Sequence, residues 1–175
     1  MRVPTPARQP ALGFVFVTVV LAVLGFGLLI PVLPELVKQF KGGDVASGSH
    51  VYGVLVSVYA FMQFFGSPIL GSLSDQFGRR KVILIALAGT SLDFVVVALA
   101  PNLGVLFVAR MVGGVTAGVL ATANAYVADV TPPEKRAQGF GLIGAAFGLG
   151  FIIGPLVGGL LGSIDLRLPF WAAAG

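Results

Sequence analysis

The chain has 175 residues, of which 57% are hydrophobic and only 10% are charged, with a formal net charge of +4 and a pI of about 9.9. A water-soluble domain carries about 25% charged residues, so this composition excludes an ordinary soluble protein and indicates an integral membrane protein. Zero cysteines and a single histidine, His50, exclude disulfides, thiol chemistry and a cluster of metal ligands.

Five apolar segments are long enough to cross a bilayer, whose core of about 30 Å requires about 20 helical residues. Runs of this length are continuous and do not alternate as barrel strands do, so the sequence predicts an all-α membrane protein. A sixth span begins at Leu168 and stops with the chain at Gly175. We expect an incomplete N-terminal six-helix bundle with spans at about 11–33, 51–73, 82–100, 103–128 and 139–161, and the start of another at 168–175.

The first span is predicted to be an uncleaved helix. Its apolar stretch exceeds the core of about 7–15 residues found in signal peptides, and Pro31 and Pro34 follow it where a small-residue cleavage site would stand. The third and fourth spans are joined by a few residues around Pro101-Asn102, which predicts a tight antiparallel pair.

The basic residues fall in short clusters between the spans, which is a topology signal and not the footprint of a nucleic-acid-binding protein. Seven lie on the side of the N-terminus and three on the other, and the positive-inside rule therefore predicts a cytoplasmic N-terminus in a multi-pass membrane protein. The seven are Arg2, Arg8, Arg79, Arg80, Lys81, Lys135 and Arg136, and the three are Lys38, Lys41 and Arg167.

Two ionisable residues lie inside predicted spans, and such residues are functional candidates because a charge in a bilayer is costly. Asp93 lies seven residues before Ala100, and Arg110 lies seven residues after Leu103. At 1.5 Å per residue both lie about 10 Å below the outer edge, at matching depth on neighbouring helices. We therefore predict a buried ion pair. For Arg110 a coupling or substrate-binding role is favoured over a purely structural one, and for Asp93 a purely structural role in helix packing is an equal alternative.

Gln63 and Asn124 are the other notable polar residues within the spans. They either line a cavity or form hydrogen bonds between helices, and the sequence favours neither interpretation.

The loop after the second span combines glycine, aspartate and arginine residues. We expect Gly71 to allow close packing at the helix end, Asp75 to cap backbone N–H groups or pair with a basic side chain, and Gly78 to permit a sharp reversal. A positive-inside turn explains the basic cluster but not the Gly-Asp-Gly spacing. The loop reads Gly71-Ser72-Leu73-Ser74-Asp75-Gln76-Phe77-Gly78-Arg79-Arg80-Lys81.

The fifth span carries Gly150, Gly154 and Gly158 at four-residue spacing, so they share one face of a helix, and Pro155 is expected to bend it. Such a face suits a contact between two sliding bundles, and ordinary small-residue packing is the alternative.

These motifs carry a resemblance to a known family. The segment from Gly71 to Arg80 resembles the signature loop of the major facilitator superfamily, and Leu24-Gly25 with Pro31-Val32-Leu33-Pro34 is similar to the helix-1 pattern of its twelve-helix drug:proton antiporters. This sequence is also similar to the helix-4 pattern of these antiporters, at Leu106, Arg110, Gly114 and Ala117-Gly118. It departs from that pattern at Gly113 and Thr116. The helix-5 antiporter motif is similar throughout, at Gly150, Gly154-Pro155 and Gly158-Gly159.

A narrower resemblance is to bacterial tetracycline exporters. It lies in Tyr59-Ala60-Phe61-Met62-Gln63, the loop at 74–80, Ser91-Leu92-Asp93, Ala128-Asp129 and the segment at 144–150. The resemblance implies a cytoplasmic gate that includes Leu73, Asp75, Arg79 and Asp129, and a proton-coupling role for Arg110. Ala22 stands where these exporters commonly carry an aspartate, which puts tetracycline itself, or the usual route of coupling, in question.

The resemblance implies proton-coupled drug export by alternating access, with H⁺ as coupling ion, no other cofactor, and no enzymatic activity. The partners would be the bilayer, an amphipathic drug, protons and a second bundle beyond Gly175, without which this chain is not expected to transport. Uptake symport and a truncated, non-transporting membrane module are the alternatives. An intramembrane protease is disfavoured because the spans hold one deep aspartate and no zinc ligands.

Overall fold

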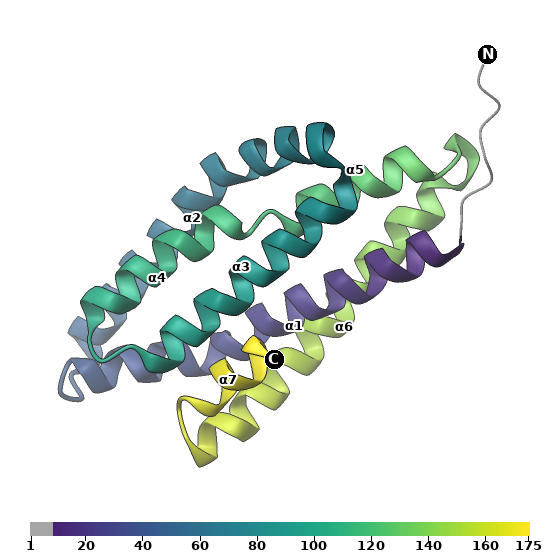
Figure 1. The fold of residues 1–175 in the computed structure, drawn as a ribbon. Coiled ribbons are helices and arrows are strands. Elements are labelled where there is room, and N and C mark those ends of the chain that lie inside the picture. The colour runs from purple at the N-terminus through teal and green to yellow at the C-terminus, as the bar shows by residue number, and fades with distance from the viewer. Residues whose placement is uncertain (1–8) are drawn as a thin grey trace.

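The computed structural model describes residues 9–175 (Figure 1). Arg2 and Arg8, which contribute to the charge count above, lie outside the described residues. Seven α-helices and one 3₁₀ turn form the described part of the chain, without any strand. They are α1 (Gln9–Phe40), α2 (Val45–Phe77), α3 (Arg79–Leu99), α4 (Leu103–Thr116), α5 (Val119–Val130), η1 (Pro133–Lys135), α6 (Arg136–Ile164) and α7 (Leu168–Ala174).

Five helical stretches within the described residues are long and apolar enough to cross a membrane, with α4 and α5 counted together and η1 joined to α6. Many large apolar side chains lie on their outer surface: Phe64, Ile152 and Ile164, for example, are 73%, 72% and 77% exposed. A soluble protein rarely exposes large apolar patches, whereas lipid solvates them well. The all-α membrane architecture expected from the sequence is therefore confirmed.

Two pairs of helices make the most extensive contacts. Helix α1 lies along α6, and α2 lies along α4, while α3 contacts α4, α5 and the short α7 (Figure 1). One buried apolar cluster joins α1, α3 and α4 around Leu36, Val97 and Leu106. A second buried apolar cluster joins α1 with α5 and α6 around Val19 and Val127. The long apolar helix α1 thus contributes to both clusters.

The helices extend several residues beyond the predicted spans, because polar residues outside the bilayer core continue them. Helix α2 begins at Val45, where the predicted span began at 51, because the Asp44 carboxylate accepts hydrogen bonds from the N–H groups of Ala46 and Ser47 at 3.3 and 3.2 Å. Hydrogen bonds from Ser47, and then from Ala46, lower the pKa of Asp44. Asn102 caps α4 in the same way, through the N–H of Val105 at 3.0 Å.

Helix α1 continues through Pro31 and Pro34 to Phe40, so the predicted end at residue 33 is wrong. Proline removes a helical hydrogen bond, but the turns beyond it are held by packing, since Leu36 and Val37 are completely buried.

The fourth span is interrupted, contrary to the single helix predicted at 103–128. Helix α4 ends at Thr116 and α5 begins at Val119, with Ala117 and Gly118 outside regular α-helix geometry. Helix α2 packs closely against the chain at this break. A side chain added at Gly66 of α2 would lie 2.5 Å from the carbonyl oxygen of Val115, and one added at Gly118 would lie 2.5 Å from Leu70, so glycines let α2 approach closely here.

Gly78 forms the junction between α2 and α3 with a φ of 98°, a conformation that L-residues with a side chain rarely adopt. We expect Gly78→Ala to lower the free energy of unfolding by about 1–3 kcal/mol, because the backbone would be strained although space is available. Chemical unfolding in detergent measures the effect. The matched control is Gly71→Ala in the helix nearby, where an added methyl meets nothing within 4 Å; equal destabilisation by both variants would contradict this explanation.

Candidate functional site

The two ionisable residues of the spans form an ion pair. Arg110 of α4 donates from Nη2 to Oδ2 of Asp93 on α3, and the side chains are only 4% and 1% exposed. The pair predicted from matching depth is therefore present. Because both side chains are almost completely buried, each charge depends largely on the other for its stability.

Space for the Asp93 carboxylate comes from a glycine on α4. A Cβ atom added at Gly113 would lie 2.6 Å from Oδ2 of Asp93. Gly113 departs from the helix-4 pattern of the family, and its contact gives that departure a physical reason: only a residue without a side chain leaves room for the ion pair.

Two polar atoms of the pair have no hydrogen-bond partner among the described residues, namely Oδ1 of Asp93 and Nε of Arg110. The guanidinium also lies over the ring of Tyr59, 5.4 Å from its centroid, in a cation–π contact. The pair therefore keeps unused hydrogen-bonding capacity in a nearly dry environment, which is unusual for a purely structural ion pair.

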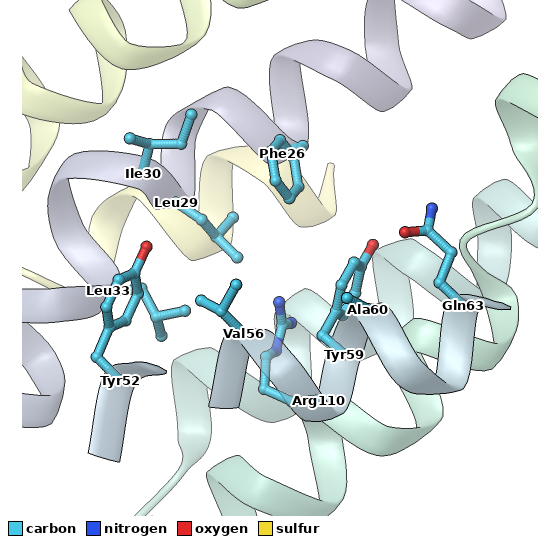
Figure 2. A pocket seen from close by; sticks show the side chains of 10 residues that line it. All are labelled: Phe26, Leu29, Ile30, Leu33, Tyr52, Val56, Tyr59, Ala60, Gln63 and Arg110. Atoms are coloured by element: carbon cyan, nitrogen blue, oxygen red, sulfur yellow. The ribbon is translucent and has the colours of Figure 1, made fainter. Parts of the chain in front are cut away.

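A cavity of about 190 Å³ lies beside Arg110, between α1, α2 and α4 (Figure 2). Its walls are mostly apolar, and its polar groups come from two tyrosines, one glutamine and the arginine. The side chains from α1 stand opposite those from α2, and Arg110 rises from α4 below them (Figure 2). The lining residues are Phe26, Leu29, Ile30, Leu33, Tyr52, Val56, Tyr59, Ala60, Gln63 and Arg110.

Gln63 and Asn124 differ in their surroundings. Gln63 lines the cavity and also donates from Nε2 to the carbonyl oxygen of Ala117 at 3.0 Å, so both interpretations of this residue hold together. Asn124 donates to the carbonyl oxygen of Leu120 in its own helix at 2.9 Å. The hydrogen bond between helices considered for Asn124 is therefore replaced by one within α5.

The loop motif forms a charged cluster around Arg79, the first residue of α3. Its guanidinium contacts Asp75 of α2 at 2.5 Å, Asp129 of α5 at 2.8 Å and the Ser74 hydroxyl oxygen at 2.6 Å. Of the two roles considered for Asp75, pairing with a basic side chain is the one observed. Ser74, which the sequence did not single out, is buried and donates its own hydroxyl to the carbonyl oxygen of Gly71 at 2.6 Å.

The remaining residues of the loop motif do not take part in the charged cluster around Arg79. Arg80 lies over the ring of Phe14 at 4.9 Å, which ties the loop to α1, and Leu73 is half-buried. The close packing expected at Gly71 is wrong, because an added side chain there would meet nothing within 4 Å.

We expect Arg79→Ala to lower the free energy of unfolding by no more than about 1 kcal/mol, because the partner carboxylates of Asp75 and Asp129 are 60% and 54% exposed and water screens such pairs. Thermal unfolding in detergent at low and high salt measures this, and the difference from wild type should shrink with salt. Lys81→Ala, an exposed residue in the same helix turn, is the control. A loss of several kcal/mol would contradict a weakly coupled surface cluster.

The glycine face of α6 packs against α1. Added Cβ atoms at Gly150, Gly154 and Gly158 would lie 2.9, 2.7 and 2.4 Å from backbone atoms of Leu24, Gly27 and Leu28. The expected contact between two sliding bundles is therefore wrong for this face, which is filled by a helix of the same bundle. Gly159 lies off this face and is exposed, and Pro155 packs near Gly27.

The helix-1 motif also lets two helices of the bundle approach each other closely. A Cβ at Gly25 would lie 2.8 Å from the ring of Phe94, so this glycine lets α1 approach α3. Pro31 and Pro34 are half-buried within the helix. Ala22 lines a second cavity that shares Phe26 with the first, so the position where the tetracycline exporters commonly carry an aspartate lies next to the candidate site.

Comparison with known proteins finds relatives that are named as tetracycline or multidrug resistance proteins. The chain is 48% identical over 164 residues to the class C tetracycline resistance protein of Escherichia coli, which covers 94% of the chain and 41% of that relative. Identity to the class B protein of Escherichia coli is 42% over 159 residues, 90% of the chain and 39% of the relative. Multidrug resistance protein 2 of Bacillus subtilis (strain 168) is 38% identical over 154 residues, 87% of the chain and 37% of the relative.

The chain thus spans about two fifths of the length of these relatives. The family model of the Major Facilitator Superfamily matches residues 15–175, a range that reaches all five candidate membrane spans of the described residues and omits only the first turn of the first one. Together with the helical bundle and the loop cluster, this match establishes that the chain belongs to the Major Facilitator Superfamily.

Proposed function

We propose that this chain is the N-terminal bundle of a transporter that exports tetracycline-like or other amphipathic compounds in exchange for protons by alternating access. The observation that carries the proposal is the buried Asp93–Arg110 pair in the wall of an apolar cavity. The relatives named as tetracycline and multidrug resistance proteins support the substrate class.

The cavity suits an amphipathic ligand. Apolar side chains from α1 and α2 would bury a ring system, and a few polar groups would fix its orientation. Half of the site would come from a second bundle facing this one, as the repeat architecture of the family implies.

Coupling would depend on the protonation of Asp93. A proton on this carboxylate would remove the counter-charge of Arg110, which lies at the cavity wall. The guanidinium would then favour a different partner, such as a polar group of the substrate, and the protein would shift toward the state that provides one. A pair with this property links proton movement to substrate binding without any further cofactor.

The Arg79 cluster would act as a cytoplasmic gate. It joins α2, α3 and α5 through exposed ion pairs that can break at small cost. This role assumes the orientation that the basic residues favour, with the N-terminus in the cytoplasm and the protein in the inner membrane.

The proposal is tested in bacteria that lack their own drug exporters and express the complete open reading frame encoding this chain. We expect lower steady-state accumulation of labelled tetracycline, or of a cationic amphipathic dye, than in cells with empty vector, and a protonophore should abolish the difference. Gly148→Ala, where an added methyl meets nothing within 4 Å, is the control for a harmless substitution.

Two outcomes would contradict the proposal. Higher accumulation in energised cells would indicate uptake symport. Unchanged accumulation of every compound, from protein that is folded and inserted, would indicate a membrane module that does not transport.

A further inference from the structure

A second cavity of similar size adjoins the first. The two share Phe26, Tyr59 and Gln63 in their walls, and the second extends to the break between α4 and α5, where Ala117 lines it. A ligand that filled both cavities would therefore pass Gln63.

The orientation of the Gln63 amide is fixed by the broken helix. Ala117 lies between α4 and α5, and its carbonyl oxygen accepts from Nε2 of Gln63 at 3.0 Å. A carbonyl oxygen can only accept, so the nitrogen must face Ala117 and the oxygen Oε1 must face away from it. Among residues 9–175, Oε1 accepts no hydrogen bond, and Figure 2 shows it on the side of Tyr59.

Thr90 of α3 also offers a hydrogen-bond acceptor to the second cavity. Its hydroxyl donates to the carbonyl oxygen of Ala86 in its own helix at 2.9 Å, so only its lone pairs are left for a ligand. Gln63 and Thr90 thus each donate to a backbone carbonyl and each keep an acceptor for the second cavity, and Gln63 also keeps its second amide N–H.

We propose that Gln63 is a specificity-determining residue of a binding site formed by the two cavities, which takes an apolar, ring-sized ligand carrying a hydroxyl or N–H donor. The donor binds Oε1 of Gln63, and the hydrogen bond to Ala117 holds that oxygen in place. This inference rests on the proposed function for its biological meaning, but the binding site itself can be tested without transport.

A site that offers an acceptor discriminates between a ligand with a hydroxyl and its methyl ether, because the ether leaves the acceptor unpaired. The probes are 2-naphthol and 2-methoxynaphthalene, which differ only in this donor. Equilibrium dialysis of each probe against the purified, full-length protein gives the ratio of the two affinities. Comparing this ratio between wild type and Gln63→Met cancels partition into detergent.

We expect the preference for 2-naphthol to be about three- to tenfold larger in wild type than in Gln63→Met. Gln76→Met, the same substitution at an exposed position of the same helix, should keep the wild-type ratio. Gln63→Leu, which also removes the acceptor, provides the same test if the methionine variant does not fold.

An equal ratio in wild type and in Gln63→Met or Gln63→Leu would overturn the inference. Failure of the proposed function is distinguishable, because a protein that does not export drugs but shows the expected ratios would retain the binding site. Conversely, a protein that exports drugs, but whose affinity ratio for the two probes is unchanged by the substitution of Gln63, would support the proposed function and exclude Gln63 as a specificity-determining residue.

Discussion

Replacing Arg110 by alanine is expected to lower the free energy of unfolding by about 3–5 kcal/mol, because it leaves the carboxylate of Asp93 buried without a partner. The side chains are 4% and 1% exposed, so water cannot take the place of the guanidinium. Chemical unfolding of the purified protein in detergent measures the loss.

A double variant separates the role of the pair in stability from its role in transport. Asp93→Asn with Arg110→Met removes both charges while retaining similar volumes, and we expect its stability to lie near that of wild type. If the pair only stabilises helix packing, this variant should also transport; if the pair couples protons to drug, it should be folded and inactive. A double variant as unstable as Arg110→Ala would show that the energetic argument is wrong.

Replacing Gly158 by alanine is expected to produce the second large effect, a loss of about 3 kcal/mol or more in the free energy of unfolding. The new methyl carbon would lie 2.4 Å from the carbonyl oxygen of Leu28, with other backbone atoms of Leu28 within 3.0 Å. Backbone cannot rotate away as a side chain can, so α1 and α6 would have to separate along their contact.

The neighbouring glycine provides a matched control. An added methyl at Gly159 meets nothing within 4 Å, so Gly159→Ala should be neutral or stabilise the helix by up to about 1 kcal/mol. Thermal unfolding of both variants in the same detergent measures the difference. Equal effects at the two positions would show that close packing against α1 is not what requires glycine in this motif.

The sequence predicted the helices and the ion pair because both follow from simple distances. Bilayer thickness sets the length of an apolar span, and the rise per residue places Asp93 and Arg110 at the same depth. The loop cluster was also foreseeable, since the motif contains both the arginine and an aspartate with which it pairs.

The remaining features depend on which helices meet, and spacing along one helix cannot reveal that. Gly150, Gly154 and Gly158 clearly share a face, but their partner is α1 and not a second bundle. The break after Thr116 arises where α2 approaches through Gly66, a residue fifty positions away along the chain. The hydrogen bond from Gln63 ends at Ala117, one of the two residues of that break, which spacing along α2 could not indicate.

The most direct test of the central claim, that the buried pair links protons to drug, is proton release from energised everted vesicles containing the complete protein. Addition of tetracycline, or of another amphipathic drug, should release protons from vesicles with wild-type protein. Release should be absent with Arg110→Ala and with the folded double variant. Drug-driven proton release that persists without Arg110 would contradict the account, and would leave the ion pair as a structural element of the bundle.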